Sequence, residues 1–139
     1  MTLTVNHLMN TLKNSHKFDR VMKDIVLKVL KEGKCVAEMK VGEEHTNPIG
    51  GLHGGCSATL VDNISSYALL SHGKGAVASV SVDMHMTYIK GAKVGDTLKI
   101  EGRTMKVEKM LAFLEDEITN IETGHLLFKG SRTFFLSKL

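Results

Sequence analysis

The sequence predicts an α+β fold in which an antiparallel sheet of five or six strands wraps around one long central helix. Residues 56–70 are almost wholly apolar, have the length of a helix and contain neither proline nor glycine. Residues 78–88 alternate apolar and polar side chains, as a long strand does, and further strand-length segments follow over 97–136. A single helix covers only one face of such a wide sheet, so we expect the sheet to curve around it.

The central helix is expected over residues 53–71, entered through the glycine turn His53-Gly54-Gly55. Drawn at about 100° per residue, the helix has two faces. The face predicted to join the core consists of Cys56, Leu60, Ile64 and Tyr67. The opposite face carries Asp62 with mostly small neighbours, namely Gly55, Ala58, Thr59, Ser65, Ser66 and Leu69.

Before this helix, the pattern predicts an N-terminal helix over residues 1–22 and then two strands. Apolar residues at positions 5, 8, 9 and 12 follow the spacing of an amphipathic helix. Residues 25–30 and 35–41 flank the turn 32–34 as a hairpin. The order helix, hairpin, long helix is the first half of the expected fold.

After the central helix, Gly73 and Gly75 mark a break and four strand-length segments follow. In the strand 78–88 the predicted apolar face is Ala78, Val80, Val82, Met84, Met86 and Tyr88, and the polar face is Ser79, Ser81, Asp83, His85 and Thr87. Residues 97–110 change phase near Gly102, which indicates a bulge. Residues 111–121 and 125–136 form a further hairpin through the turn 122–124.

Composition narrows the class of protein. A length of 139 residues, 42% of them hydrophobic and 24% charged, predicts one soluble domain over 1–139. The net charge of +3, without a dense basic block, argues against nucleic acid and suits an anionic small molecule. No apolar run reaches the length of a membrane span.

Cys35 and Cys56 are isolated in the sequence, which fits a reducing compartment and neither a disulfide framework nor a zinc site. The N-terminus lacks the apolar core of a secretory signal, so we expect a cytoplasmic protein. Residues 1–18 contain no acid and carry Lys13 and Lys17, which makes a mitochondrial location a second expectation, although arginine is absent there.

Candidate chemistry centres on Asn47, Gly54 and Asp62. Amides in the first turn of a helix have no partner inside it and lie at the positive end of the helix dipole, so Gly54 can serve as an oxyanion donor. A carboxylate on a helix face of small residues, which another segment or a ligand can approach closely, is costly to remove from water unless it is paired or takes part in function. The alternatives are that the glycines form only an entry turn and that Asp62 is a solvated surface acid.

The segments VGEEHTNPIGGLHGGCSATLVDN and SVSVDMHMTYIKGAKVGD resemble the hotdog-fold acyl-CoA thioesterases, and the resemblance spans nearly the whole chain. It implies that Asn47 and the Gly54 amide polarise a thioester carbonyl while Asp62, from a partner protomer, activates water or attacks directly. Ser81 would hold the water, and His53 would support the site. Pro48 departs from the small residue that relatives often carry, and it restricts Asn47 to extended geometry.

The resemblance also implies where coenzyme A binds and how the chain assembles. The implied contacts are Ser81, Tyr88, Ile89, Lys90, Gly91, Ala92, Lys93, Lys106, Val107, Glu108, Lys109, Met110, Leu111 and Phe135. The implied assembly is a homotetramer made of two dimers, with active sites at the dimer interface. No metal or cofactor is expected, because coenzyme A is part of the substrate.

Two functions from different classes follow. The first is hydrolysis of medium- to long-chain fatty acyl-CoA to free fatty acid and coenzyme A. The second is a non-catalytic module that senses acyl-CoA or lipid and acts through a protein partner, such as a lipid-binding protein. A pure binding module has no need for the acid Asp62 beside Asn47, Gly54 and Ser81. A dehydratase of the same fold would want a catalytic histidine paired with its acid.

Overall fold

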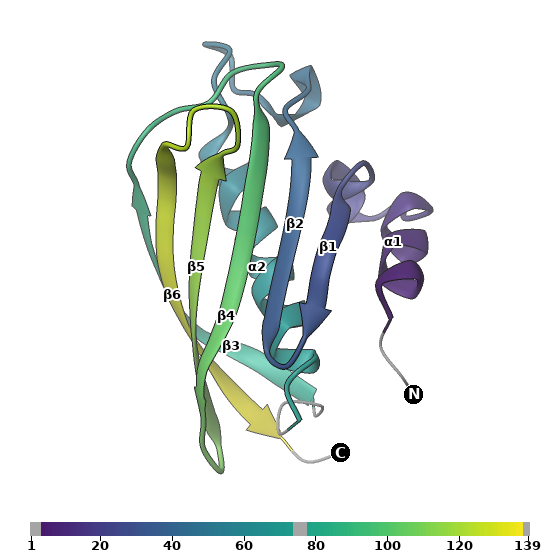
Figure 1. Ribbon diagram of the computed structural model, residues 1–139, viewed down its shortest axis with the longest axis vertical. Helices are drawn as coiled ribbons and strands as arrows, with labels where there is room; N and C mark the ends of the chain where they lie inside the picture. Colours follow the sequence, from purple (N-terminus) through teal and green to yellow (C-terminus); the bar gives the residue numbers. More distant parts are fainter. Residues whose placement is uncertain (1–3, 74–77, 138–139) are drawn as a thin grey trace.

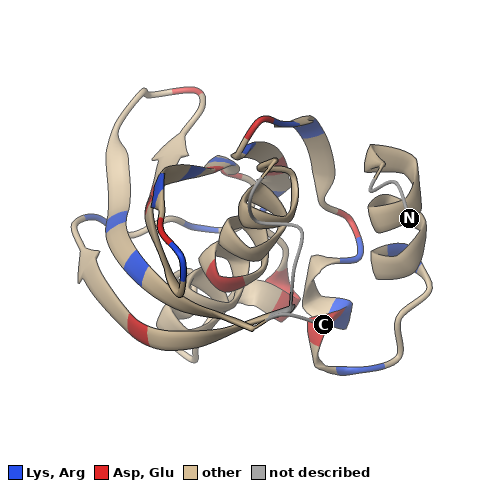
Figure 2. Cartoon of the chain, turned by 90° about the horizontal axis from the view of Figure 1, so that it is seen from below, with Lys and Arg blue, Asp and Glu red and all other residues tan. Residues whose placement is uncertain are grey.

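The computed structural model describes residues 4–73 and 78–137, and it confirms the predicted fold class. Six antiparallel strands form one sheet that curves around the long helix α2 (Figures 1 and 2). The elements in chain order are α1 (Val5–Lys13), η1 (Phe18–Met22), β1 (Val26–Lys31), β2 (Lys34–Lys40), η2 (Glu43–His45), α2 (Gly54–Leu70), β3 (Ala78–Tyr88), β4 (Thr97–Val107), β5 (Leu111–Asn120) and β6 (Leu126–Ser137). Each predicted strand is present, with small shifts at its ends.

The strands lie in the order β1-β2-β4-β5-β6-β3, so β1 and β3 are the two edges. The edge at β1 lies beside α1 (Figure 1). The β3 edge exposes apolar side chains in a single chain, since Val80 is 64% and Val82 is 57% exposed. An uncovered, apolar edge of this length invites pairing with another strand.

The N-terminal segment departs from the single helix predicted over 1–22. Helix α1 begins after Thr4, whose side chain accepts a hydrogen bond from the His7 amide at 3.1 Å, and it ends at Lys13, with Asn14 as its C-cap. Side-chain hydrogen bonds replace the helix there, because the Ser15 hydroxyl donates to Asp19 at 2.6 Å. The short 3₁₀ helix η1 follows, and residues 1–3 of the predicted helix lie outside the described residues.

Helix α2 packs on β2, β4 and β5 and buries a broader face than its sequence predicts. Leu60 and Ile64 are buried as expected, and Tyr67 is partly buried. The prediction that Ser65 and Leu69 lie on the open face with Asp62 is wrong, because both are fully buried. Strand β4 passes close beneath the helix at Gly102, where an added Cβ would lie 3.2 Å from the Ser65 Cα.

Strand β3 contains a bulge that the alternation of its residues conceals. Its register against β6 shifts between Ser81 and Asp83, so Val82 has no partner opposite it. The predicted faces of this strand are therefore wrong in its first half. Val80 and Val82 are exposed, while Ser81 shares the inner face with the partly buried Met84. The side chain of Ala78 and the predicted break at Gly75 lie outside what the structure describes.

The second predicted bulge, near Gly102, is displaced along its strand. The register of β4 against β5 shifts between Thr104 and Lys106 instead.

Figure 2 shows basic and acidic residues interspersed over the strands and loops. None of the helices within the described ranges has the length and apolar character needed to cross a membrane.

Candidate active site

The loop that enters α2 fixes the orientation of the Asn47 carboxamide. Its Oδ1 accepts hydrogen bonds from the amides of Ile49 at 2.9 Å and Gly51 at 3.2 Å, and its backbone amide donates to the Gly51 carbonyl at 2.8 Å. The oxygen is therefore used by the loop itself. The Nδ2 group is left as a donor for a ligand at this end of the helix.

The first turn of α2 leaves one backbone donor open. His53 is the N-cap, and its Nδ1 accepts a hydrogen bond from the Gly55 amide at 2.8 Å. The preceding amide, that of Gly54, meets no acceptor among the described residues and lies at the positive end of the helix dipole. The Tyr88 hydroxyl donates to the Gly54 carbonyl at 2.9 Å and so joins the end of β3 to this turn. His53 thus acts on the geometry of the turn.

A pocket of about 290 Å³ opens beside this turn. It is lined by Gly54 and Ser57 of α2 and by the stretch from Tyr88 to Ala92, which follows β3. A second pocket, of about 330 Å³, continues past Lys93 and His125. The structure therefore brings the predicted carbonyl donor Gly54 and the first predicted coenzyme A segment to one concave surface.

The two lysines of that segment each meet one other side chain. Lys90 Nζ lies 2.9 Å from His125 Nδ1, and Lys93 Nζ lies 3.6 Å from Asp96 Oδ1. The Asp96 carboxylate also accepts the Lys93 amide at 3.0 Å, which orders the turn. Both ammonium groups stay exposed at the pocket mouth, where an anionic group can reach them.

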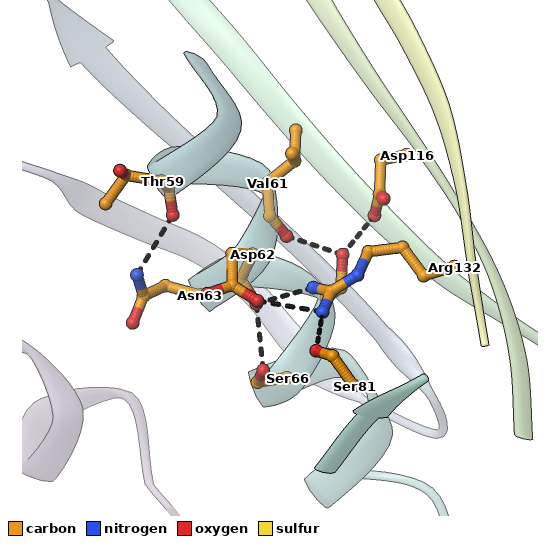
Figure 3. A network of polar contacts seen from close by, with 9 residues as sticks. Thr59, Val61, Asp62, Asn63, Ser66, Ser81, Asp116 and Arg132 are labelled. Atoms are coloured by element: carbon orange, nitrogen blue, oxygen red, sulfur yellow. Dashed lines mark hydrogen bonds and ion pairs between the residues drawn. The ribbon is translucent and has the colours of Figure 1, made fainter. Parts of the chain in front are cut away.

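Asp62 lies two turns along α2 and forms an ion pair with a buried arginine (Figure 3). Its carboxylate is 51% exposed, and its Oδ1 is 2.8 Å from Nη2 of Arg132 on β6. Arg132 Nη1 donates to the Asp62 main-chain carbonyl at 3.1 Å, and Nη2 also donates to the Ser81 hydroxyl. The structure thus brings the predicted residues Asp62 and Ser81 together through an arginine.

The second predicted coenzyme A segment, 106–111, lies at the other end of the molecule (Figure 1). It forms the turn between β4 and β5, where Lys106 pairs with Glu108 at 3.0 Å. Phe135 of β6 lies opposite Leu111, so it belongs to this end as well. Strand β4 has 11 residues, which at about 3.3 Å each separate the two segments by roughly 35 Å.

The predicted catalytic residues therefore fall into two clusters within one chain. The amide cluster comprises Asn47 and Gly54 at the N-terminus of α2, next to the predicted His53 at the N-cap. The acid cluster comprises the predicted Asp62 and Ser81 together with Arg132, which was not predicted. Gly54 and Asp62 are separated along the helix by a rise of about 12 Å. One chain cannot bring both clusters to a single carbonyl group.

Comparison with known proteins identifies the family to which this chain belongs. The family-wide sequence profile of the Thioesterase superfamily matches residues 49–126, which include all of α2 and the strands β3 to β5. The chain belongs to the thioesterase superfamily.

Two relatives match this thioesterase over almost its full length. It is 45% identical over 133 residues to acyl-coenzyme A thioesterase 13 of Homo sapiens, an alignment that covers 96% of this chain and 94% of the human protein. The crystal structure of zebra fish thioesterase superfamily member 2 superposes with a TM-score of 0.92 at 40% identity, and covers 98% of this chain and 100% of that one. The predicted hotdog-fold acyl-CoA thioesterase family is thereby confirmed.

A more distant relative carries a bound ligand. A hypothetical thioesterase from Streptococcus pneumoniae, solved with coenzyme A, superposes with a TM-score of 0.78 at 28% identity. The match covers 84% of this chain and 88% of that one. The shared fold therefore accommodates coenzyme A in that protein.

Sequence reasoning missed two charged residues inside this thioesterase, Arg132 and Asp116. Asp116 of β5 is 1% exposed, and one of its oxygens accepts a hydrogen bond from the Ser65 hydroxyl. Burial raises the pKa of Asp116 to about 6, against the opposing effects of Ser65, Arg132 and Arg103. The signal was present in the sequence, since each residue occupies an inward position between apolar residues of the same strand face.

Proposed function

We propose that this thioesterase hydrolyses medium- to long-chain fatty acyl-CoA to free fatty acid and coenzyme A. The observation that carries the proposal is the pair of clusters. One offers free N–H groups that can donate to a thioester carbonyl, and the other offers a carboxylate beside a hydroxyl. The relatives named acyl-coenzyme A thioesterase 13 support the substrate class. Coenzyme A enters as part of the substrate, not as a resident cofactor.

A complete site requires two protomers in this proposal. The amide cluster of one chain faces the acid cluster of its partner, because the helix rise separates the clusters within a chain. The exposed edge of β3 supports a dimer formed by pairing the two β3 strands, which would cover Val80 and Val82. Two such dimers then form the homotetramer.

The reaction begins with the thioester carbonyl oxygen between Asn47 Nδ2 and the Gly54 amide. Asp62 of the partner chain takes a proton from water, and the water oxygen forms a bond to the carbonyl carbon. Negative charge on the carbonyl oxygen is stabilised by the two donors and the helix dipole. The carbon–sulfur bond then breaks, and the proton passes to the departing thiolate of coenzyme A. Direct attack by Asp62 is the alternative course.

Ser81 holds the attacking water, and His53 keeps the Gly54 turn in place through its bond to the Gly55 amide. We assign the nucleotide and pantetheine portions of coenzyme A to the segment 88–93 of one protomer and to the segment 106–111 with Phe135 of the other. The pocket at Gly54 and the coenzyme A complex of the streptococcal relative support this assignment.

We place the protein in the cytoplasm, with the mitochondrion as a second compartment, on the support of two free buried thiols, Cys35 and Cys56. A lipid-binding protein partner stays a prediction from the sequence.

The test is release of coenzyme A thiol from a panel of acyl-CoAs, from acetyl to stearoyl, by the purified protein. We expect turnover to peak within the medium to long chains, and Asp62→Asn to lower kcat on the order of 10²–10⁴-fold while the protein stays folded. Asp24→Asn, which removes an exposed carboxylate outside both clusters, should keep wild-type turnover. Absence of thiol release by the wild-type protein would favour the non-catalytic module instead.

A further inference from the structure

We propose that Arg132 is a positioning residue for the hydrolysis, fixing Asp62 and Ser81 next to each other so that both address one water molecule. The inference rests on the proposed function and names a residue that the sequence motifs do not contain. It follows from the burial of Arg132, from its contacts, and from the gap that it spans between helix and sheet.

Burial is the first observation. Arg132 lies in the middle of β6 and is 2% exposed, whereas arginine is almost never fully buried unless it is paired. Its guanidinium carbon lies 4.4 Å from the centre of the Phe134 ring, which packs against one face of the group. This enclosure restricts the orientations available to the guanidinium.

The contacts of the guanidinium show that it points toward Asp62 and Ser81. Nη1 donates to the main-chain carbonyl of Asp62 at 3.1 Å, and Nη2 contacts the carboxylate of the same residue at 2.8 Å. This two-point contact fixes both the helix backbone and the side-chain rotamer of Asp62. Nη2 also donates to Ser81, so the carboxylate and the hydroxyl meet at one nitrogen (Figure 3).

Arg132 joins elements that otherwise lie apart. Helix α2 packs mainly on β2, β4 and β5, while β6 and β3 continue the sheet beyond them. Asp62 and Ser81 come from α2 and from the edge strand β3, and Arg132 reaches both from β6, across 70 and 51 residues of sequence. Without this side chain, an exposed carboxylate and an edge-strand serine would move independently.

The direction of the hydrogen bond to Ser81 has a chemical consequence. Because the Ser81 oxygen accepts from Arg132, the serine proton stays available to be donated elsewhere. Asp62 Oδ1 faces the arginine, so Oδ2 is the oxygen left for water. A water molecule between Oδ2 and the serine hydroxyl is then held by one acceptor and one donor. Its remaining lone pair can attack the thioester carbon.

The polar group behind Arg132 contributes to its fixed position. Asp116, held by Ser65, supplies a second negative charge on the inner face of the sheet, and its field acts on Arg132. Arg132 Nε finds no acceptor among the described residues, so the guanidinium is anchored by its two terminal nitrogens only. Its position therefore depends on Asp62 and Ser81 as much as theirs depends on it.

The experiment compares Arg132→Met, Arg132→Lys and Asp62→Asn, singly and in combination, by thiol release from one long-chain acyl-CoA. We expect Arg132→Met to lower kcat by roughly 10²-fold and to change KM by less than about twofold, because misplacing a catalytic group by about 1 Å has an effect of this size. Arg132→Lys keeps the charge without the two-point contact, so it should recover only part of kcat.

A double mutant tests whether Arg132 acts through Asp62. If it does, Asp62→Asn combined with Arg132→Met should be no slower than Asp62→Asn alone. Arg103→Met is the matched control, since Arg103 is also held by carboxylates, those of Glu101 and Glu117, but outside both clusters. This control should keep the wild-type kcat.

The outcomes separate the two proposals. If the wild-type protein is active and Arg132→Met keeps the wild-type kcat, or changes KM only, the role of Arg132 is overturned and the proposed function stands. Losses that multiply in the double mutant also overturn it, since Arg132 would then act independently of Asp62. A wild-type protein without thiol release overturns the proposed function and the role of Arg132 with it. If Arg132→Met does not fold, full kcat in Arg132→Lys overturns the role and a partial kcat supports it.

Discussion

The buried carboxyl of Asp116 makes the stability of the fold depend on pH, and the direction follows from its surroundings. Its pKa rises from 3.8 to about 6 in the folded chain because the group is removed from water. The folded state therefore holds this proton more tightly than the unfolded state does. Stability from the protonated carboxyl is complete below about pH 3.8 and is lost as the pH rises to about 6.

The magnitude follows from the same pKa values. A tenfold change in proton affinity corresponds to about 1.4 kcal/mol, so the complete titration should lower the free energy of unfolding by about 3 kcal/mol. Asp116→Asn removes the titration while keeping an oxygen that can accept from Ser65. Between pH 4 and pH 7 the wild-type protein should therefore lose about 2 kcal/mol relative to this variant, since the unfolded chain's carboxyl is already partly ionised at pH 4.

Urea unfolding at a series of pH values measures this difference, with the protomer concentration held fixed because assembly contributes to stability. Asp24→Asn controls for the loss of one carboxylate at an exposed position. A difference between the wild-type protein and Asp116→Asn that stays constant from pH 4 to pH 7 would refute the reasoning. If the wild-type protein instead gained stability relative to Asp116→Asn as the pH rises, the attraction of Arg132 would outweigh burial.

Three further outcomes are expected. Val82→Lys, which places a charge on the exposed edge of β3, should shift the proposed homotetramer to smaller species in light scattering, and an unchanged tetramer would exclude this edge from the interface. Lys90→Ala and Lys93→Ala should raise KM for acyl-CoA about two- to fivefold, with little change in kcat and less effect at high salt. Equal losses on an acyl-pantetheine substrate, which lacks the nucleotide, would place the phosphates elsewhere. Burial raises the pKa of Cys35 to about 12 and of Cys56 to about 11, so the folded protein should resist iodoacetamide at pH 8, and rapid labelling of either thiol would contradict its burial.

Local patterns were sufficient for the fold and for half of the candidate site. The glycine turn at Gly54, the acid in the following helix and the alternation of β3 are all visible over short stretches of sequence. The bulge at Val82 is not, because one extra residue leaves the alternation intact while it reverses which face is buried. The serine at position 81 was thus placed on the polar face, whereas it points inward to an arginine.

The remaining part depends on contacts between distant segments. Arg132 and Ser65 look like ordinary polar residues in their own segments, and each acquires its role from a partner more than 50 residues away. Helical periodicity placed Ser65 with Asp62 on an open face, since it contains no information about how closely a neighbouring strand approaches. The sequence shows that Asp116 lies among apolar residues of one strand face, but it does not show that Ser65 is its partner.

The close approach of β4 to α2 makes the position of Asp62, the proposed catalytic carboxylate, adjustable from a residue outside the proposed site. Gly102 lies directly under Ser65, and an added methyl group would meet the helix backbone at 3.2 to 3.3 Å. Backbone at this distance cannot turn aside as a side chain can, so the helix itself must move by a few tenths of an ångström. Asp62, one turn earlier, would move with it, and its distance from the amide cluster that the proposed dimer places opposite it would change. Gly102→Ala would therefore shift Asp62 by a few tenths of an ångström while every residue assigned to the proposed site keeps its identity.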